Sequence, residues 1–206
     1  MINKLKEYNA FYMNNNSYGK EEYPEVFKYT DRKSKLILSA PHATKSFVSK
    51  KEKPADLYTG AIVEYVGKKT ETSTLIRSKY VNEKVLISDY VTNKGLEKHF
   101  FVDVHGFDKD IEYDVCLGIC EYETKGYPYL EDIIAIVQKY NLKTIVNYPG
   151  YTGKSGFTRR YQEQFGKPNI IQMELKRYLR DFYQNPEIVE KTTIPMMIDV
   201  ANCYKK

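Results

Sequence analysis

Short apolar runs of strand type alternate along this chain with segments of helical hydrophobic spacing. The apolar runs are residues 35–40, 74–77, 85–87, 100–102, 113–120, 142–146 and 170–175, and the helical segments are 57–66, 129–140, 176–183 and a terminal stretch over 188–200. Strands that alternate with helices form α/β domains, in which a mixed, mostly parallel sheet is flanked by helices. The sequence therefore predicts one α/β domain over residues 1–206, because no linker favours two. Residues 1–34 leave room for an edge strand but support no firm prediction.

Composition limits the partners that this chain can have. The net charge is +5 over 206 residues, with lysines and acidic residues interspersed and no nucleic-acid-binding motif. We therefore expect no nucleic-acid partner, whereas a modest positive field suits a small anionic substrate. The amino-terminal residues form no apolar signal segment, and no apolar run is long enough to cross a membrane. The expectation is a cytoplasmic protein without a membrane partner.

Two motifs that suggest other chemistry fail on spacing. The three cysteines are an odd number without regular spacing, so they form no disulfide framework, and no Cys/His pair accompanies them as a structural zinc site would require. Buried thiols are the better interpretation. Gly153-Lys154-Ser155 matches the end of a phosphate-binding loop, but Gly150 lies too close for the required spacing. A nucleotide site is not predicted.

Residues 98–107 contain the most informative stretch. Three apolar residues, 100–102, are followed by Asp103-Val104-His105-Gly106. Alternate residues of a strand share a face, so Asp103 and His105 should point the same way, and Gly106 lets the backbone turn. A histidine at this position suits a metal or catalytic site, because ligands in open α/β sheets bind beyond the carboxyl ends of the strands. A structural histidine beside a turn-capping aspartate is the alternative that this stretch alone leaves open.

Other strand ends supply matching groups. His42 follows the apolar run 35–40, and Asp56 lies at or near the start of the helix over 57–66, where it could equally serve as an N-cap. Zinc catalysts commonly use two histidines and one carboxylate, which leaves a fourth position for water, so His42, Asp56 and His105 are the candidate ligands. Glu174 follows a strand and could carry the proton transfers, or it could be an exposed glutamate favoured by the helix dipole. Asp103 is expected to orient His105 rather than to bind metal.

Five motifs in order are similar to those of the N-formylglutamate amidohydrolase family. They are Ser39-Ala-Pro-His42-Ala43, Asp56-x-x-Thr59, Asp103-Val-His105-Gly106, Gly156-Phe-Thr-Arg159 and Gln172-Met-Glu174-Leu175. The resemblance covers residues 35–183 and implies a phosphorylase/hydrolase-like α/β fold, related to the zinc carboxypeptidases, around one metal ion. It maps His42, Asp56 and His105 to metal positions and Glu174 to the catalytic carboxylate. It also maps Arg159 to a clamp on the substrate carboxylate, and we expect the neighbouring Arg160 to face solvent.

The chain departs from the related patterns at two places. Lys45 stands where the His-x-x-Glu pair of the carboxypeptidases has its glutamate, so the carboxylate ligand is assigned to Asp56. An Asn-Arg pair that many relatives carry before the second histidine has no clear counterpart, and Asn93-Lys94 is the nearest.

Three hypotheses follow for the function. The leading one is a zinc-dependent amidohydrolase that cleaves a C–N bond in a small acidic N-acyl amino acid or peptide-like substrate. The second is a degenerate relative that binds a metabolite or a protein partner without turnover. The third is a Cys-His hydrolase using Cys116 or Cys120, which is disfavoured because neither cysteine lies at a strand-to-helix turn. Metal analysis together with a hydrolysis assay separates the first two.

Overall fold

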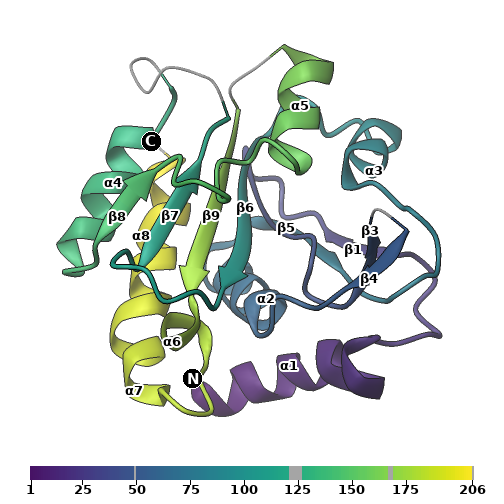
Figure 1. Ribbon diagram of the computed structural model, residues 1–206, viewed down its shortest axis with the longest axis horizontal. Helices are drawn as coiled ribbons and strands as arrows, with labels where there is room; N and C mark the ends of the chain where they lie inside the picture. The colour runs from purple at the N-terminus through teal and green to yellow at the C-terminus, as the bar shows by residue number, and fades with distance from the viewer. Residues whose placement is uncertain (49, 121–126, 167–168, 206) are drawn as a thin grey trace.

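A computed structural model describes residues 1–48, 50–120, 127–166 and 169–205, and Figure 1 shows the arrangement of its elements. The helices are α1 (Ile2–Ser17), α2 (Thr59–Thr70), α3 (Ile87–Asn93), α4 (Leu130–Lys139), α5 (Phe157–Phe165), α6 (Arg177–Arg180), α7 (Pro186–Ile188) and α8 (Ile194–Cys203), with a π-helical turn η1 (Val189–Thr193). The strands are β1 (Phe27–Thr30), β2 (Leu36–Ala40), β3 (Ser46–Val48), β4 (Lys51–Lys53), β5 (Ser73–Arg77), β6 (Phe100–Phe107), β7 (Val115–Gly118), β8 (Thr144–Val146) and β9 (Ile170–Lys176).

Seven of these strands form one twisted sheet in the order β1-β5-β2-β6-β9-β7-β8. The four central strands β5, β2, β6 and β9 run parallel to one another, whereas β1 pairs antiparallel with β5, and β7 pairs antiparallel with β9. The predicted α/β class, with a mixed and mostly parallel sheet flanked by helices, is therefore confirmed. The remaining two strands, β3 and β4, form a separate hairpin beside the sheet (Figure 1).

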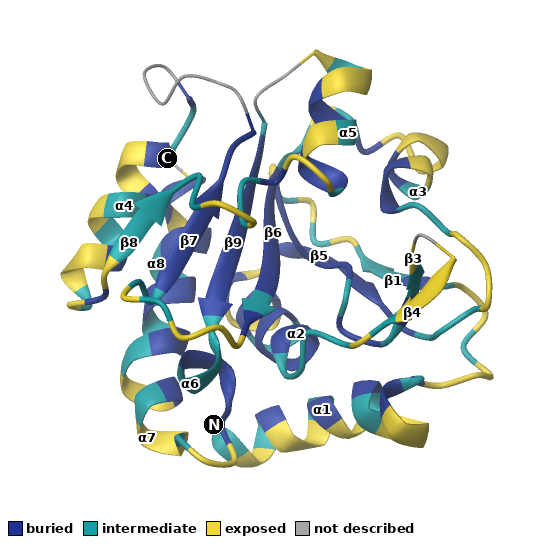
Figure 2. Cartoon of the chain, viewed as in Figure 1, coloured by how far each residue is buried: buried dark blue, intermediate teal, exposed yellow. Residues whose placement is uncertain are grey.

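Side chains of the parallel strands alternate between two buried cores. On one face, residues such as Leu38, Val102 and Met173 pack with α1, α2, α4 and α8. On the other face, Ile37, Phe101 and Ile170 pack with α3 and α5, and Figure 2 shows the strands buried between these layers. Because the period of a strand is two, later odd-numbered positions of β6 and even-numbered positions of β9 belong to the α3/α5 face. The polar residues at the strand ends therefore face the same side as α5.

The structure corrects three expectations at the edges of this fold. The apolar run 85–87 is not a strand, because Ile87 is the first residue of α3 and packs in the core between that helix and the sheet. Residues 1–34 do hold an edge strand, β1, but they also form α1, which their weak periodicity did not predict. The Lys/Ser-rich composition of residues 43–55 is typical of a solvated loop, but this segment contains the β3–β4 hairpin. No helix within the described residues is long and apolar enough to cross a membrane. All three cysteines are buried, which confirms the expectation for Cys116 and Cys120.

A buried arginine holds the loops that follow β6 and β9. Arg180 is 2% exposed, and its guanidinium donates to the carbonyl oxygens of Leu57, Leu175 and Phe107 and pairs with Asp108. It packs flat on Gly106, where an added Cβ would lie 2.3 Å from the Arg180 Nε. Position 106 requires glycine because the Arg180 guanidinium approaches its Cα so closely. By donating to both Phe107 and Leu57, Arg180 connects the end of β6 to the segment that precedes α2.

Candidate active site

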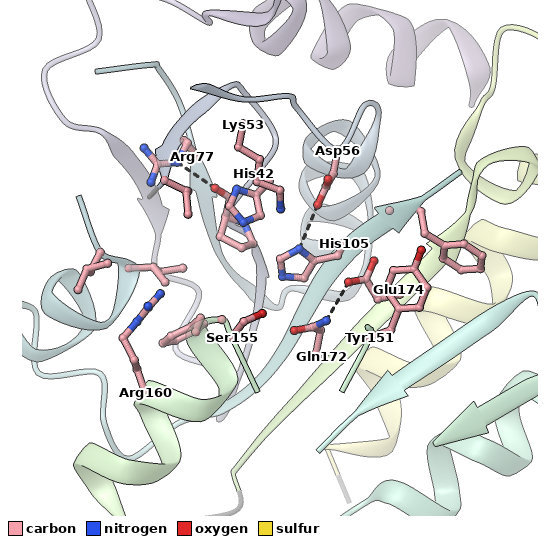
Figure 3. A pocket seen from close by; sticks show the side chains of 18 of the residues that line it. His42, Lys53, Asp56, Arg77, His105, Tyr151, Ser155, Arg160, Gln172 and Glu174 are labelled. Carbon is pink, nitrogen blue, oxygen red and sulfur yellow. Dashed lines mark hydrogen bonds and ion pairs between the residues drawn. The ribbon is translucent and has the colours of Figure 1, made fainter. Parts of the chain in front are cut away.

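A cavity of about 650 Å³ opens at the carboxyl ends of β2, β6 and β9, and Figure 3 shows the labelled side chains of its wall. The early residues Phe101 and Ile170 of β6 and β9 are covered by α3 and α5, so the later residues of that face remain open to the cavity. In the register of these two strands, His105 lies beside Glu174. The sheet therefore presents an imidazole and a carboxylate side by side at one edge, where ligands of parallel sheets bind.

His105 lies between two carboxylates. Its Nε2 is 2.8 Å from Oδ2 of Asp103, and its Nδ1 is 3.0 Å from Oδ2 of Asp56. Asp103 is fully buried, and its other oxygen accepts a hydrogen bond of 2.5 Å from the Ser39 hydroxyl on the adjacent strand β2. The predicted common face of Asp103 and His105 is thus confirmed, and Asp103 fixes the imidazole from behind.

Asp56 reaches this position because it precedes α2 without capping it. The residue before the first turn of the helix is Tyr58, which has a positive φ of 76°, and no side chain caps the helix. Thr59 donates its backbone N–H and its hydroxyl to the carbonyl oxygen of Asp56, which leaves the carboxylate available to His105. The N-cap interpretation of Asp56 is therefore wrong.

His42 stands beside this group after β2. Its ring centroid lies 5.2 Å from that of His105, and its Nδ1 is 3.0 Å from the hydroxyl of Ser46 on β3. The backbone N–H of Asp56 donates to the carbonyl oxygen of His42 over 2.8 Å. Burial and the positive charge of Lys53 lower the pKa of His42 well below its ordinary value, so the imidazole is neutral at physiological pH. A neutral imidazole is the form that binds metals.

The positive charge of His105 and the negative charges of Asp56 and Asp103 stabilise each other. Burial opposes protonation of His105, but the charge of Asp103 and the hydrogen bonds that the imidazolium donates to both carboxylates outweigh it and raise the pKa of His105 to about 10. Burial likewise opposes ionisation of Asp56, yet the hydrogen bond and charge of His105 hold the pKa of Asp56 well below its usual range. The arrangement is that of an imidazolium between two carboxylates when no other cation is close.

Glu174 completes the wall from β9. It is 7% exposed, and Gln172 donates a hydrogen bond of 2.8 Å to its Oε1. Burial raises the pKa of Glu174 above the ordinary value of a glutamate. A buried carboxylate with a raised pKa at a cavity wall is suited to accept and return a proton near neutral pH. The exposed-glutamate interpretation is therefore wrong.

Asp56 and His105 are spaced much as two ligands of one zinc ion would be. Within the described ranges, no three His, Cys, Asp or Glu side chains already form a metal-binding group. Two ligands at the distances that zinc prefers lie about 3.3 Å apart in a tetrahedral site. The 3.0 Å between His105 Nδ1 and Asp56 Oδ2 is close to that spacing, and Asp103 on Nε2 would leave Nδ1 as the binding atom. The donor chemistry fits zinc, and on His42 the contact of Nδ1 with Ser46 leaves Nε2 as the binding atom.

The two adjacent arginines of α5 occupy places opposite to those expected. Arg159 is exposed, and its Nε lies 2.6 Å from Oε1 of Glu163 one turn further along the helix. Arg160 instead lines the cavity, and its buried Nε has no hydrogen-bond partner in the part of the chain that is described. The expectation that Arg160 faces solvent is therefore wrong. In a helix, consecutive residues point about 100° apart, so one register step decides which arginine reaches the cavity.

Lysines of the β3–β4 region also differ in their roles. Lys45, the residue in place of a carboxypeptidase glutamate, pairs with Glu52 over 3.0 Å and lies over the ring of Tyr18. Lys53, at the end of β4, lines the cavity close to His42 and Asp56 (Figure 3). Sequence reasoning missed Lys53 because it assigned the lysine-rich segment to a solvated loop. The only available signal was its position three residues before Asp56.

Comparisons place this architecture among known hydrolase structures. No protein-family model and no curated protein sequence matches the chain. Among solved structures, a bacteriophage poly-gamma-glutamate hydrolase is 16% identical with a TM-score of 0.56, over 90% of this chain and 89% of that one.

Two further solved structures are similar to this chain over most of their length. N-formylglutamate amidohydrolase from Ralstonia eutropha JMP134 is 12% identical with a TM-score of 0.57, over 87% of this chain and 98% of that one. A gene product of Agrobacterium tumefaciens is also 12% identical, with a TM-score of 0.56, over 92% and 100% of the two chains. The structural neighbours thus include the family that the sequence motifs resemble, and this chain has the α/β fold that the three structures share.

Proposed function

We propose that this protein is a metal-dependent amidohydrolase that cleaves a C–N bond in a small acidic N-acyl amino acid or peptide-like substrate. The observation that carries the proposal is the meeting of His42, Asp56, His105 and Glu174 at one cavity, although they come from four separate segments of the chain. Asp103 behind His105 supports it, because a carboxylate on the outer nitrogen is the usual support of a metal-binding histidine.

His42, Asp56 and His105 would hold the ion. A bound zinc ion would supply Lewis acidity, which polarises a carbonyl group and lowers the pKa of water. Asp103 keeps the proton of His105 on Nε2, so that Nδ1 faces the cavity. The contact of His42 Nδ1 with Ser46 would leave Nε2 as the atom for the ion, as is usual for a metal-binding histidine.

Glu174 is proposed as the proton carrier. Its carboxylate would take a proton from the attacking water and deliver it to the leaving nitrogen, while Gln172 fixes one of its oxygens. The water oxygen forms a bond to the acyl carbon as the C–N bond breaks, and the products are a carboxylate and an amine. Because the side chain is 7% exposed, bulk water competes little for this proton.

Arg160 takes over the recognition role first assigned to Arg159. A guanidinium offers a planar fork of donors to a carboxylate, and the Nε of Arg160 is buried beside the cavity without a partner among the described residues. Burying a donor unpaired is costly, so an anionic substrate group is a natural partner for it. The acidic substrates named for two structural neighbours are of this kind.

One observation favours the non-catalytic alternative. Both ring nitrogens of His105 already contact carboxylates, and such a pair is stable without any ion. A protein that used this site only for binding would keep that closed arrangement.

The experiment that tests the proposal combines metal analysis with turnover. The purified protein is loaded with zinc, desalted and analysed for bound metal, and is then incubated with N-formylglutamate, N-acetylglutamate and a short γ-glutamyl oligomer. One zinc per chain and release of amine from at least one probe are expected, with both lost in His105→Ala. Binding of a probe without metal or hydrolysis would instead support the non-catalytic alternative.

A further inference from the structure

Lys53 belongs to the cross-strand pair of the β3–β4 hairpin that contacts the candidate metal site. In the antiparallel register of β3 and β4, Lys53 is directly opposite Ser46, whose hydroxyl is 3.0 Å from Nδ1 of His42. Three residues later, the backbone N–H of Asp56 donates to the carbonyl oxygen of His42. Lys53 is therefore held between two direct contacts to His42, and Figure 3 shows it at the end of the cavity where His42 and Asp56 meet.

Within the part of the chain that the structure describes, the ammonium of Lys53 has no partner of its own. Across the described residues, no hydrogen bond or ion pair engages it, whereas the neighbouring Glu52 is already paired with Lys45. A half-buried cation without a counter-ion at a cavity wall is available to a negatively charged or polar ligand atom.

We propose that the Lys53 ammonium binds the carbonyl oxygen of the scissile amide and stabilises the negative charge that develops there during hydrolysis. This role rests on the proposed amidohydrolase function. When the water oxygen adds to the acyl carbon, the carbonyl π electrons move to oxygen, and the adjacent ammonium offsets that charge without itself giving up a proton. As the C–N bond breaks, the carbonyl bond forms again, and the leaving nitrogen receives its proton from Glu174.

Position assigns Lys53 to the carbonyl oxygen rather than to the acidic group of the substrate. Arg160 lies across the cavity on α5, far from His42 and Asp56 in the view of Figure 3, whereas Lys53 lies beside both. A substrate whose acidic group meets Arg160 would place its amide between Glu174 and the His42 side. An ammonium there acts as a point charge that binds the transition state more tightly than the neutral amide, and such interactions raise kcat.

Kinetics of three variants test this role. Lys53→Met removes the charge, Lys53→Arg keeps it, and Lys51→Met is the matched control, because Lys51 is an exposed lysine of the same strand that does not line the cavity. On whichever probe the wild type hydrolyses, Lys53→Met should lower kcat by about 10²–10³-fold, as removal of one oxyanion donor does. Lys53→Arg should recover part of this loss, and KM and bound zinc should stay near wild type in all three variants.

A binding measurement separates this proposal from the proposed function. The probe is the methylphosphonamidate of glutamate, whose tetrahedral phosphorus replaces the planar acyl carbon, and calorimetry needs no turnover. Lys53→Met should lower affinity for this mimic by about the factor lost in kcat. Affinity of Glu174→Gln/Lys53→Met for planar N-acetylglutamate should match that of Glu174→Gln. Equal losses for the mimic and the planar amide, or no loss for the mimic, would overturn the role of Lys53. Wild-type protein that hydrolyses no probe would refute the amidohydrolase function itself.

Discussion

The carboxylate of Asp103 lies 2.8 Å from Nε2 of His105, the residue two positions further along the same strand. Since Asp103 is fully buried and its other oxygen is held by Ser39, the imidazole has one preferred orientation. Asp103→Asn should weaken zinc affinity by about 10–100-fold, because a neutral amide holds the Nε2–H tautomer that metal binding requires less strongly than a carboxylate does. Competition with a chelator measures the affinity. Asp199→Asn, which removes a carboxylate paired with Lys139 at the surface, is the control, and equal zinc affinity in all three proteins would assign Asp103 a purely structural role.

Glu174→Gln should separate turnover from metal binding. The amide cannot accept the proton of the attacking water, so kcat should fall by at least the roughly 10²–10⁴-fold that general acid–base catalysis contributes. Bound zinc, measured on the same samples, should not change. Glu163→Gln, at an exposed position on α5, should keep wild-type kcat. Near-normal turnover in Glu174→Gln would remove the proposed mechanism.

The two arginines of α5 give opposite expectations for the same substitution. Arg160→Lys should raise KM by about 10-fold, the equivalent of 1.4 kcal/mol, because an ammonium cannot reproduce the planar contact with a carboxylate. Arg159→Lys should leave KM unchanged, since Arg159 pairs with Glu163 outside the cavity. Steady-state kinetics of both variants are the measurement, and a rise in KM for Arg159→Lys alone would restore the role that the sequence motifs gave it.

Stability of the metal-free protein should depend on pH through Glu174. Burial raises the folded-state pKa of this carboxyl, so its favourable contribution is complete below the unfolded value near 4.5 and is lost as pH rises through the folded value. Gln stays neutral at every pH. In chelator, Glu174→Gln should therefore melt a few degrees above wild type at pH 8, corresponding to about 1 kcal/mol, and the gap should close near pH 4. A variant that melts below wild type at pH 8 would show that the ionised carboxylate is stabilised in place.

The contact of Gly106 with Arg180 predicts a costly substitution. An alanine Cβ would lie 2.3 Å from the Arg180 Nε, and Arg180 cannot retreat without breaking hydrogen bonds to Leu57, Leu175 and Phe107. Gly106→Ala should lower the free energy of unfolding by about 2 kcal/mol or more, measured by urea denaturation. Gly95→Ala meets no atom and should cost only about 1 kcal/mol for its positive φ. Equal costs would mean that Arg180 moves freely.

Strand ends were predictable from sequence because burial and alternation act locally. A run such as residues 100–102 specifies a buried strand, and a period of two then puts Asp103 and His105 on one face whatever the rest of the chain does. The adjacency of His105 and Glu174 is different, since it depends on the register of β6 against β9, which no local pattern encodes. The expectation that His105 and Glu174 belong to one site therefore came from the resemblance to a known family and not from a physical argument.

Other features depend on tertiary context. The run 85–87 was assigned to a strand because short apolar runs fit either type of element, and Ile87 became the start of a helix that covers the sheet. Arg159 and Arg160 differ by one helical position, so the side that faces the cavity depends on where α5 begins, after Gly156. Lys53 faces the cavity because a hairpin folds back over His42, and a polar, charged segment gives little sign of a strand.

The β3–β4 hairpin joins the site without joining the main sheet. Lys53 lines the cavity from it and Ser46 contacts His42, yet among the described residues its strands pair with each other and not with the main sheet. Substitutions in the hairpin therefore leave the hydrogen-bond ladders of the seven-stranded sheet intact. Substitutions that alter this wall of the cavity should therefore cost little stability, whereas Asp103, His105 and Glu174 lie on strands of the main sheet. Hairpin positions other than Ser46 and Lys53 are therefore free to diverge in sequence faster than the residues that serve the chemistry.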